Sequence, residues 1–499
     1  MGGAAARVPF PAGLAAAAEI SGFRAAFAER DITPEIGMEQ PGGYGKFYHK
    51  TFHDSCKVRA AVFDDGRNVV ALVGVDALAV PRALVERCRQ AIAEQCGIPG
   101  HAVLIGASHS HSSGPIEGVM PGEYEHASPL VKRLAYEQST CVNPVYLERV
   151  RTEIVTAVCQ AYSYRQPALC AVGKGREDKA GYNRRIRMKN GQTWSHPHPG
   201  NPDMVEYAGP IDPEVGVIAA WDSKGRMLGS IVNYACHATT SPGGISANWI
   251  YYLEKTIRGA MESDAPVVFL QGACGDVTQV DNFSRYATPP GEDWARLVGA
   301  RVGAEAVKVL VTQPRGSLAP LDAKSTVLRI PRRKPRPERV RRSLELVQRD
   351  PKQVGITEWT FAKEIVMLDA IIEREPVAGV EVQAMQVGPA VFLTNPAELF
   401  VEFGLDLKAR SPFPYTFPVE LANGLVGYVP TEEAFGPHGG GYETRLTSYS
   451  NLEIGAGRKM VSAALELAGA MKPGKAPEAP PAPPFREPWL YGNVPPEVD

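Results

Sequence analysis

The sequence predicts an α/β protein, a single large domain with mixed β-sheets over roughly residues 26–472. Short apolar runs bounded by turn residues recur along the chain, which is typical of buried strands. Stretches with apolar residues at helical spacing alternate with these runs, and some runs pair through short turns. The chain has 499 residues, of which 44% are apolar, so a sizeable core can form.

The N-terminal half is expected to begin with a flexible leader over residues 1–25, and regular structure should start near Arg30. A helix is predicted over residues 81–95, because Leu84, Cys88 and Ile92 recur at helical spacing. The other elements expected in this half are strands over 58–63, 69–78 and 103–107, a helix over 146–161, and a hairpin of strands over 217–221 and 230–234.

The C-terminal half alternates helices with a second hairpin, whose turn is Gly388-Pro389. The elements expected there are strands over 380–387 and 390–394 and helices over 293–311, 338–348, 359–373, 398–409 and 457–470. The second and third of these helices are charged enough to be surface elements. From Pro473 to residue 499 the chain is rich in proline, so a disordered or surface-hugging tail is expected.

The charge balance and the apolar pattern exclude several classes of protein. Lys and Arg number 53 against 55 Asp and Glu, so the net charge of -2 argues against a nucleic-acid partner. One basic run, residues 331–337, is interpreted as a solvated loop before a helix. No run reaches the ~18 apolar residues of a membrane span, so no integral membrane association is expected.

The N-terminal apolar stretch at residues 14–18 is too short for the core of a signal peptide, so a cytoplasmic location is expected. The eight cysteines are scattered without a CxxC pair. In a long chain without an export signal, such cysteines are typical of reduced, mostly buried thiols.

Reactive polar residues follow several of the apolar runs. His109 and His111 follow the run at 103–107, His237 follows the run at 230–234, and Glu398 follows the run at 390–394. Ligands gather at the carboxyl ends of strands in α/β sheets, and zinc accepts imidazole and carboxylate ligands. The pattern predicts a metal-capable site, although each residue alone is equally compatible with a hydrogen-bonded structural role.

A second HxH pair, His196-Pro197-His198, lies in a segment rich in glycine and proline. This segment is predicted to be a loop. It could form a lid that faces the substrate, or it could be an alternative metal pair.

Six short motifs then occur in a fixed order between residues 28 and 470. They are residues 107–112, 181–184, 233–239, 275–278, 396–398 and 427–433. In this order the chain resembles the N-terminal catalytic domain of the neutral/alkaline non-lysosomal ceramidases. Members of that family are zinc-dependent amidases that cleave the N-acyl bond of ceramide. The resemblance implies the fold of that catalytic domain.

The resemblance also implies roles for individual residues. The implied zinc ligands are His109, His237, Glu398 and Tyr428. The residues implied to act on the substrate are His111 and Arg184 at the amide, Tyr442 at the oxyanion, and Thr278 where the family has serine. Spacing alone does not predict Tyr428 as a ligand. Thr278 is expected to orient the substrate through a hydrogen bond, and a purely structural role remains the alternative.

Three departures from the family pattern bear on the substrate. Thr278-Gln279 replaces the family's serine and proline, Ala397 stands where the family often has glycine, and the family's C-terminal immunoglobulin-like domain is not expected here. An export signal is not expected either. Residues 184–187 contain three arginines, and Arg184 could pair with a carboxylate of the substrate. We therefore expect a small or polar substrate and not long-chain ceramide. If Arg184 pairs with a carboxylate, the substrate is expected to be acidic.

Together these observations predict a zinc-dependent amidohydrolase that uses a metal-activated water on a small-molecule amide. Two alternatives remain at this point: a metal-dependent hydrolase of an ester or glycosidic bond, and a non-catalytic binding protein on the same fold. The sequence leaves open the identity of the acyl group, the role of the His196/His198 loop, and whether the chain forms a homo-oligomer.

Overall fold

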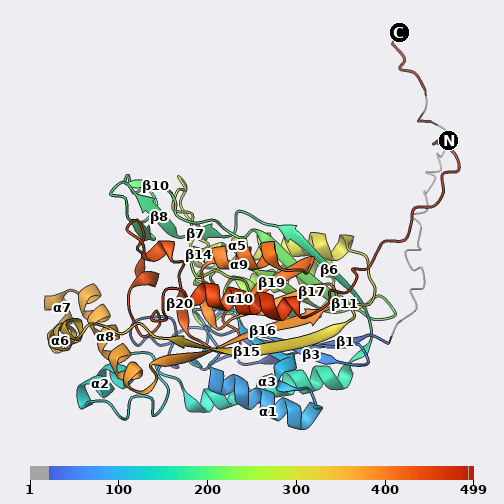
Figure 1. Cartoon of the computed structure of the whole chain (residues 1–499). Coiled ribbons are helices and arrows are strands. Elements are labelled where there is room, and N and C mark those ends of the chain that lie inside the picture. Colours follow the sequence, from blue (N-terminus) through green and yellow to red (C-terminus); the bar gives the residue numbers. More distant parts are fainter. Residues whose placement is uncertain (1–21, 490, 493, 499) are drawn as a thin grey trace.

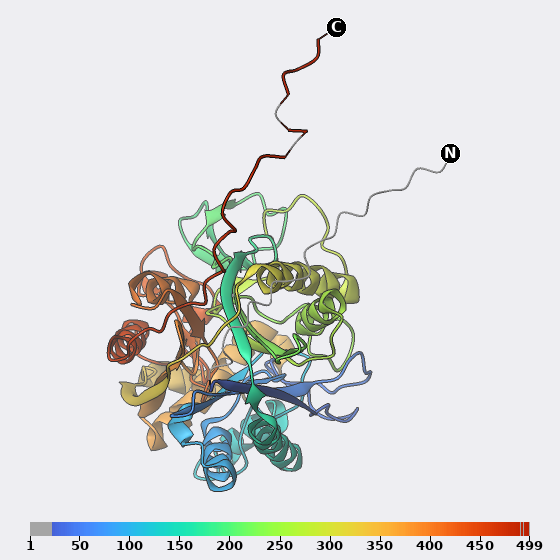
Figure 2. The same cartoon turned by 90° about the vertical axis from the view of Figure 1, so that its right-hand side faces the viewer.

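The computed structural model describes residues 22–489, 491–492 and 494–498. Three β-sheets meet in the interior, and each carries long helices on its outer side (Figure 2). The predicted α/β class with mixed sheets is confirmed. Among the described residues, no helix combines the length and the apolar character needed to cross a membrane.

The first sheet has the strand order β4-β3-β2-β1-β5. Its strands are β1 (Arg24–Asp31), β2 (Lys57–Asp64), β3 (Val69–Val75), β4 (Val103–Ala107) and β5 (Gln166–Pro167). β3 and β4 run parallel and the other pairs run antiparallel. The helices α1 (Arg82–Cys96) and α3 (Pro144–Tyr164) pack against each other on the outer side of this sheet (Figure 1).

The second sheet has the order β13-β12-β11-β6. Its strands are β6 (Leu169–Arg176), β11 (Glu214–Trp221), β12 (Met227–Tyr234) and β13 (Val267–Gln271). β11 and β12 form the predicted hairpin, and β12 and β13 run parallel. Its outer face is covered by α4 (Trp249–Met261) and α5 (Gly291–Thr312).

The third sheet has the order β15-β16-β17-β19. Its strands are β15 (Leu321–Pro331), β16 (Val377–Val387), β17 (Ala390–Thr394) and β19 (Tyr415–Val419). β16 and β17 form the second predicted hairpin, and β17 and β19 run parallel. The helices α9 (Val401–Arg410) and α10 (Ala456–Gly469) pack on its outer side.

One apolar cluster joins the inner faces of all three sheets. Leu72 from the first sheet, Leu270 from the second and Phe392 from the third are fully buried in it. Burial of one such side chain contributes about 1.5–3 kcal/mol. The first two sheets approach closely at Gly74, where an added Cβ atom would lie 2.5 Å from the Phe269 carbonyl oxygen. Glycine is therefore required at this contact.

Shorter elements lie around this three-sheet body. They are β7 (Tyr182–Asn183), β8 (Arg185–Met188), β9 (Thr193–Ser195), β10 (Met204–Tyr207), β14 (Val277–Thr278), β18 (Ala397–Leu399), β20 (Gly427–Val429), α2 (Pro129–Gln138), α6 (Pro337–Leu346), α7 (Pro351–Val354), α8 (Ile356–Arg374), and the short 3-10 turns η1 (Gly100–Ala102), η2 (Glu433–Phe435) and η3 (Tyr442–Thr444). β14 pairs with β7, and β18 pairs with β20. Helices α6, α7 and α8 lie together at one end of the molecule (Figure 1).

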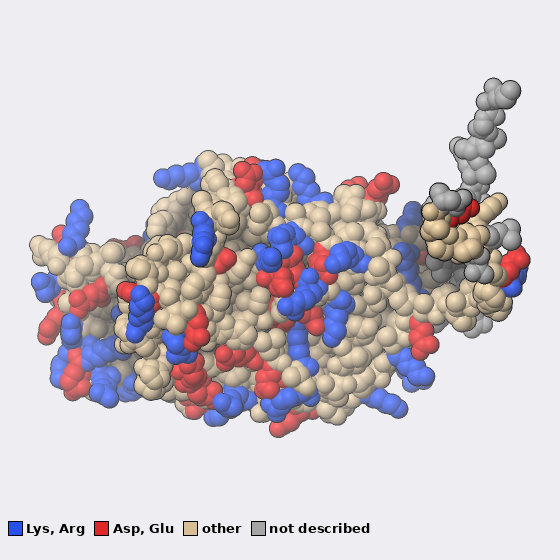
Figure 3. All heavy atoms as spheres, turned by 90° about the horizontal axis from the view of Figure 1, so that it is seen from above, with Lys and Arg blue, Asp and Glu red and all other residues tan. Residues whose placement is uncertain are grey.

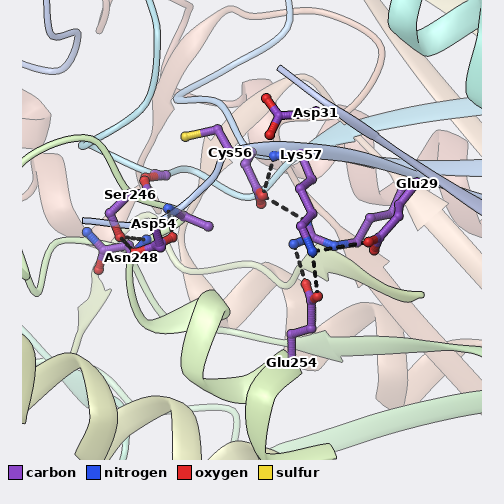
Figure 4. Close-up of polar contacts among 12 residues, drawn as sticks. Glu29, Asp31, Asp54, Cys56, Lys57, Ser246, Asn248 and Glu254 are labelled. Atoms are coloured by element: carbon purple, nitrogen blue, oxygen red, sulfur yellow. Dashed lines mark hydrogen bonds and ion pairs between the residues drawn. The ribbon is translucent and has the colours of Figure 1, made fainter. Parts of the chain in front are cut away.

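A buried network of charges ties the first sheet to α4 (Figure 4). The Arg59 guanidinium donates to Asp76 at 2.8 Å and forms an ion pair with Glu254. Lys57 and Arg258 also pair with Glu254, at 2.8 and 2.5 Å. Because Glu254 has three cationic partners, its charge is compensated although it is buried.

Three expectations from the sequence are corrected by the fold. β1 begins at Arg24, inside the expected leader and before Arg30, because Ala25 and Ala28 pack into the core. Residues 1–21 of that leader lie outside the described residues. The helix α8 is largely buried, although it was expected at the surface, because its apolar residues pack against α2 and Lys363 donates to the Tyr44 carbonyl and to Ser139. Glu398 lies in β18, and the following helix starts only at Val401.

The proline-rich tail starts by following the surface of the third sheet. The Gly474 N–H donates to the Gly388 carbonyl at 3.0 Å, and the Gln386 amide donates to the Lys472 carbonyl at 2.8 Å. On the face shown in Figure 3, basic and acidic side chains are interspersed. This face therefore lacks the continuous basic surface that a nucleic-acid partner requires.

Candidate metal centre and active site

Three histidine rings converge where two of the predicted strands end. His109 and His111 follow β4, and His237 follows β12. One nitrogen of each ring lies within 4.8 Å of the others, and among the described residues no other group of this kind could hold a metal ion. The sequence predicted this convergence of distant segments, and the fold confirms it.

Backbone carbonyls fix the orientation of two of these rings. The Nδ1 atom of His109 lies 2.9 Å from the Leu78 carbonyl oxygen, and the Nδ1 atom of His237 lies 3.1 Å from the Val277 carbonyl oxygen. In both rings Nε2 is therefore left to face the centre, which is the arrangement of metal-ligating histidines. His109 also has a positive φ of 61°, which is uncommon for a residue with a side chain and clusters at functional sites.

Hydrogen bonds with a segment around Ser246 hold the loop that carries His109 and His111. The Ser246 N–H donates to the Ser112 carbonyl at 2.9 Å, and the Ser110 hydroxyl donates to the Ser246 carbonyl at 2.8 Å. Asp54 accepts from the Ser246 hydroxyl and from the Ala247 N–H (Figure 4). The two histidines are thus held on a loop tied down on both sides.

Glu398 lies against the histidines on the opposite side of the centre. Its Oε2 atom is 3.3 Å from Nε2 of His109 and 3.3 Å from Nε2 of His237. This oxygen is buried and has no hydrogen-bond partner. A buried polar atom without a partner costs about 1–3 kcal/mol, so it calls for a ligand that the protein does not itself supply. The geometry fits a cation between these three side chains.

Tyr428 stands beside Glu398 because the strands β18 and β20 are parallel and these two residues are partners in the register. The phenol oxygen of Tyr428 lies 3.1 Å from that of Tyr442. Burial, followed by the negative charge of Glu398, raises the pKa of Tyr428 well above its ordinary value. A tyrosinate at this position therefore requires a bound cation.

The protonation states of the other groups suit a metal centre. Burial lowers the pKa of His237 to about 3, and the Arg184 guanidinium adds to this effect. Burial also lowers the pKa of His111 well below its ordinary value. Both rings are therefore neutral near pH 7, the form that binds metals. Burial alone would raise the pKa of Glu398, but His109 and His237 hold it well below its ordinary value.

Arg184 is fully enclosed and aims one end of its guanidinium at the centre. Its Nε atom donates to Glu443 at 2.7 Å, and a terminal nitrogen donates to the Gly275 carbonyl at 2.7 Å. The other terminal nitrogen lies 3.1 Å from Nε2 of His237. Two edges of the guanidinium are thus occupied by the protein. The terminal nitrogen beside His237 is the part of the guanidinium that could donate to a substrate oxygen.

A cleft of about 620 Å³ opens beside Tyr442. Two segments line it, residues 192–198 and 439–445. The first contains His196-Pro197-His198, in which both histidines have a positive φ. The His196 N–H donates to the Arg184 carbonyl at 2.9 Å, and among the described residues this pair is not part of a metal-capable group. The loop therefore forms a wall of the cleft, which agrees with the substrate-facing alternative.

Thr278 is buried on β14, directly after Val277, whose carbonyl contacts the His237 ring. The Thr278 hydroxyl accepts a hydrogen bond of 3.3 Å from the Val280 N–H. This contact shapes the turn after the strand.

Several residues around the centre carried no signal in the sequence. Glu443 is fully buried and accepts from Arg184 and, at 2.5 Å, from the Ser195 hydroxyl. Glu420 accepts from the Cys274 thiol at 2.9 Å and from the Leu399 N–H at 2.8 Å, and the Cys274 sulfur lies 3.4 Å from Nδ1 of His237. In the sequence, the only indication that Glu443 lies near the centre was its position next to Tyr442.

The loop that contains Gln40 and Gly42 packs next to His111. The Gln40 amide donates to the His111 carbonyl at 2.7 Å. At Gly42, whose φ is +91°, an added Cβ atom would lie 2.4 Å from Nδ1 of His111. The loop can approach the ring this closely only because residue 42 is glycine.

Comparisons with known proteins agree with the resemblance seen in the motifs. The chain is 24% identical over 339 residues to the neutral ceramidase of Pseudomonas aeruginosa, a match that covers 63% of this chain and 46% of that protein. The match thus spans about half the length of this relative. No family model matches the chain.

Two solved structures have the same fold. A ceramidase complexed with C2 matches with a TM-score of 0.65 and 18% identity, covering 92% of this chain and 77% of that one. The crystal structure of neutral ceramidase from Pseudomonas aeruginosa matches with a TM-score of 0.64 and 18% identity, covering 92% and 76%. The predicted resemblance to the neutral ceramidases is confirmed, and the fold is that of a ceramidase.

Proposed function

We propose that this chain is a zinc-dependent amidohydrolase that cleaves an N-acyl bond in a small or polar substrate. The observation that carries this proposal is the unpartnered Glu398 Oε2 atom, equidistant at 3.3 Å from Nε2 of His109 and His237. The ceramidase fold and the sequence match to a neutral ceramidase support an amide as the bond that is cleaved.

The proposed zinc ligands are His109, His237, Glu398 and Tyr428. Two imidazoles and two oxygen donors are of the ligand types that zinc accepts. His111 is the third ring of the histidine group, and we assign it to the substrate side. A zinc ion in this position would polarise the carbonyl of the amide and activate water near neutral pH.

Arg184 and Tyr442 are the proposed donors to the amide oxygen. The Tyr442 ring lies 5.0 Å from the Arg184 guanidinium carbon, so both can point at one oxygen as it gains negative charge. A well-placed donor of this type contributes about 3–4 kcal/mol to catalysis. Glu443 holds Arg184 in place through the 2.7 Å bond to Nε.

His111 is the proposed proton carrier. Its Nε2 atom lies 3.4 Å from Nε2 of His109, and burial lowers its pKa, so the ring is neutral near pH 7. The attacking water loses a proton and the leaving amine needs one when the bond breaks, and His111 would carry this proton from the first to the second. Thr278 is proposed to orient the substrate near these groups.

The lining of the cleft supports a polar substrate. The segment at residues 192–198 contributes Gln192, Thr193 and Ser195, together with the two histidines of the loop. Gln192 and the two histidines can form hydrogen bonds with a polar substrate. The hydroxyls of Thr193 and Ser195 already donate to the His438 carbonyl and to Glu443.

The test is a matched substrate series given to zinc-loaded protein: N-acyl amides with acetyl, butanoyl and hexanoyl groups, the corresponding esters, and a long-chain ceramide. We expect turnover of the short amides, and its loss in His237→Ala but not in His101→Ala, whose side chain is exposed. Efficient turnover of the ceramide alone would contradict the proposed substrate. Turnover of the esters alone would contradict the proposed reaction.

A further inference from the structure

Arg445 lines the cleft three residues after Tyr442, and it has no acidic partner among the described residues, nor do two other arginines, Arg339 and Arg333. Neither Arg445 nor Arg339 nor Arg333 has a carboxylate within 4.0 Å among the described residues, although their neighbours Arg332, Arg341 and Arg342 each have one. Arginines that stay unpaired beside a cleft are candidates for binding an anion.

The packing of two helices brings Arg339 to Arg445. Arg342 on α6 pairs with Glu358 on α8 at 2.7 Å, which fixes the alignment of the two helices. One turn away from this pair, Arg339 lies on α6 and Phe361 lies on α8. The Arg445 guanidinium carbon stacks 3.3 Å from the centre of the Phe361 ring. Arg445 thus lies against α8, and α8 packs on α6, the helix that carries Arg339.

Arg333 continues this cluster at the start of α6. Its guanidinium donates to the carbonyls of Leu452 and Ser450, both at 2.9 Å, and stacks 4.7 Å from the Phe435 ring centre. Burial lowers the pKa of Arg333 to about 10, and the positive charge of Arg339 adds to this effect. Burial also lowers the pKa of Arg339, and here Arg445 adds to it. The positive charge of one arginine thus lowers the pKa of the next, and no carboxylate within 4.0 Å among the described residues offsets this repulsion between the guanidinium groups.

Two buried acidic groups on neighbouring segments, Glu364 and Glu443, are already engaged. Glu364 accepts from the Ser448 hydroxyl at 2.5 Å and lies 3.4 Å from the Lys363 ammonium. Glu443 is bound to Arg184. The arginines of segment 184–187, which suggested an acidic substrate from the sequence, are engaged as well. Arg187, for example, pairs with Glu206 at 3.2 Å and with Glu433 at 3.4 Å.

We propose that Arg445, supported by Arg339 and Arg333, binds an anionic oxygen group of the substrate, so that the substrate class is an amide carrying a carboxylate or a phosphate. This inference rests on the proposed amidohydrolase function. Arg445 and Tyr442 line the same cleft within one turn of chain. An amide held at Tyr442 therefore places a group a few bonds away beside the Arg445 guanidinium.

The first experiment measures binding without catalysis. Calorimetric titration of the zinc-loaded protein with glutarate, inorganic phosphate and the neutral glutaramide distinguishes the two anion sources. We expect one of the anions to bind at least about 10-fold more tightly than glutaramide, and Arg445→Gln to remove this preference. The control Arg341→Gln, which changes an exposed arginine of α6 that pairs with Glu338, should keep it. Equal affinity for all three ligands would overturn the anion site, whatever the activity of the enzyme.

The second experiment uses kcat/KM for two short amides of equal length, one ending in a carboxylate and one in a neutral amide. We expect the ratio of the two values to fall at least about 10-fold in Arg445→Gln and to a smaller extent in Arg339→Gln, mainly through KM. A ratio that is the same in wild type and Arg445→Gln would overturn the assignment. If neither amide is hydrolysed although the anion still binds, the proposed function fails and the anion site stands.

Discussion

Glu398 and Tyr428 are direct partners in the register of two short parallel strands, β18 and β20. They are far apart in the sequence, yet this pairing places a carboxylate and a phenol side by side at the edge of the histidine group. The remaining contacts of the centre come from loops that follow longer strands. The β18–β20 pair is therefore the element that supplies both oxygen ligands of the proposed zinc site.

Replacing Tyr428 with Phe tests this pair. The ring and its packing remain, but the phenol oxygen is lost, so zinc affinity should fall by about 10-fold or more. Competition with a chelator of known affinity measures the change. Tyr449→Phe is the control, because that ring lies 6.1 Å from Tyr428 and its hydroxyl bonds to Tyr44. Equal zinc affinity of wild type and Tyr428→Phe would remove Tyr428 from the ligand set.

Replacing Glu443 with Gln should disturb Arg184. The buried guanidinium loses its charged partner, so kcat should fall by about 100-fold and stability by about 3–5 kcal/mol. Steady-state kinetics and urea unfolding measure the two effects. Glu433→Gln is the control, because its pair with Arg187 is exposed. A Glu443→Gln enzyme with wild-type kcat would show that the orientation of Arg184 does not matter for catalysis.

Substitutions of Thr278 distinguish an orienting role of its hydroxyl from a purely structural role. Thr278→Ser should keep most of the activity, because the hydroxyl remains. Thr278→Ala should lower kcat by about 10- to 100-fold, which corresponds to about 1.4–2.8 kcal/mol, with unchanged zinc content. Full activity in Thr278→Ala would leave the residue with only its hydrogen bond from Val280. An acyl group trapped on Thr278 and detected by mass spectrometry would point to a covalent mechanism instead.

The buried network around Glu254 predicts a pH dependence of stability. Burial would raise the pKa of Glu254, but Arg59, Lys57 and Arg258 outweigh it and lower this pKa to about 2. In the unfolded chain the pKa of a glutamate is about 4.3. A group whose pKa is lower in the folded state stabilises the fold above its unfolded pKa. That contribution disappears as the pH falls through the folded pKa.

Glu254→Gln should therefore lower the free energy of unfolding by about 3–5 kcal/mol at pH 7, and its difference from wild type should shrink between pH 5 and pH 2. Urea unfolding of both proteins across this range measures the effect. Glu86→Gln, which removes an exposed pair with Arg82, should show almost no difference at either pH. A difference that does not change with pH would mean that packing, and not charge, accounts for the role of Glu254.

The sequence predicted most of the long helices and many of the long strands because their apolar periodicity is strong, but it missed the long strands β6 and β15. It missed β1, in which charged residues such as Arg24 and Arg30 interrupt the pattern while Ala25 and Ala28 are buried. It also placed α8 at the surface, because the burial of Lys363 depends on acceptors from two distant loops. The hydrogen bonds that compensate this buried charge depend on tertiary structure and leave no local pattern in the sequence.

The residues of the candidate site also fall into two groups, those that the sequence could predict and those that it could not. His109, His237 and Glu398 could be found because each follows an apolar run, whereas Tyr428 and Tyr442 depended on the resemblance to a family. The role of Glu443 could not be predicted, because its partner Arg184 lies 259 positions away in the sequence. The unpaired state of Arg445 is likewise visible only once all neighbouring carboxylates are placed.

The most direct test of the account is the metal content of the purified protein, measured together with its amide hydrolysis before and after metal removal. We predict about one zinc per chain, loss of activity when a chelator removes it, and recovery when zinc is returned. His237→Ala should lack both metal and activity, while His101→Ala should retain both. Protein that is free of transition metal and still fully active would contradict the central claim.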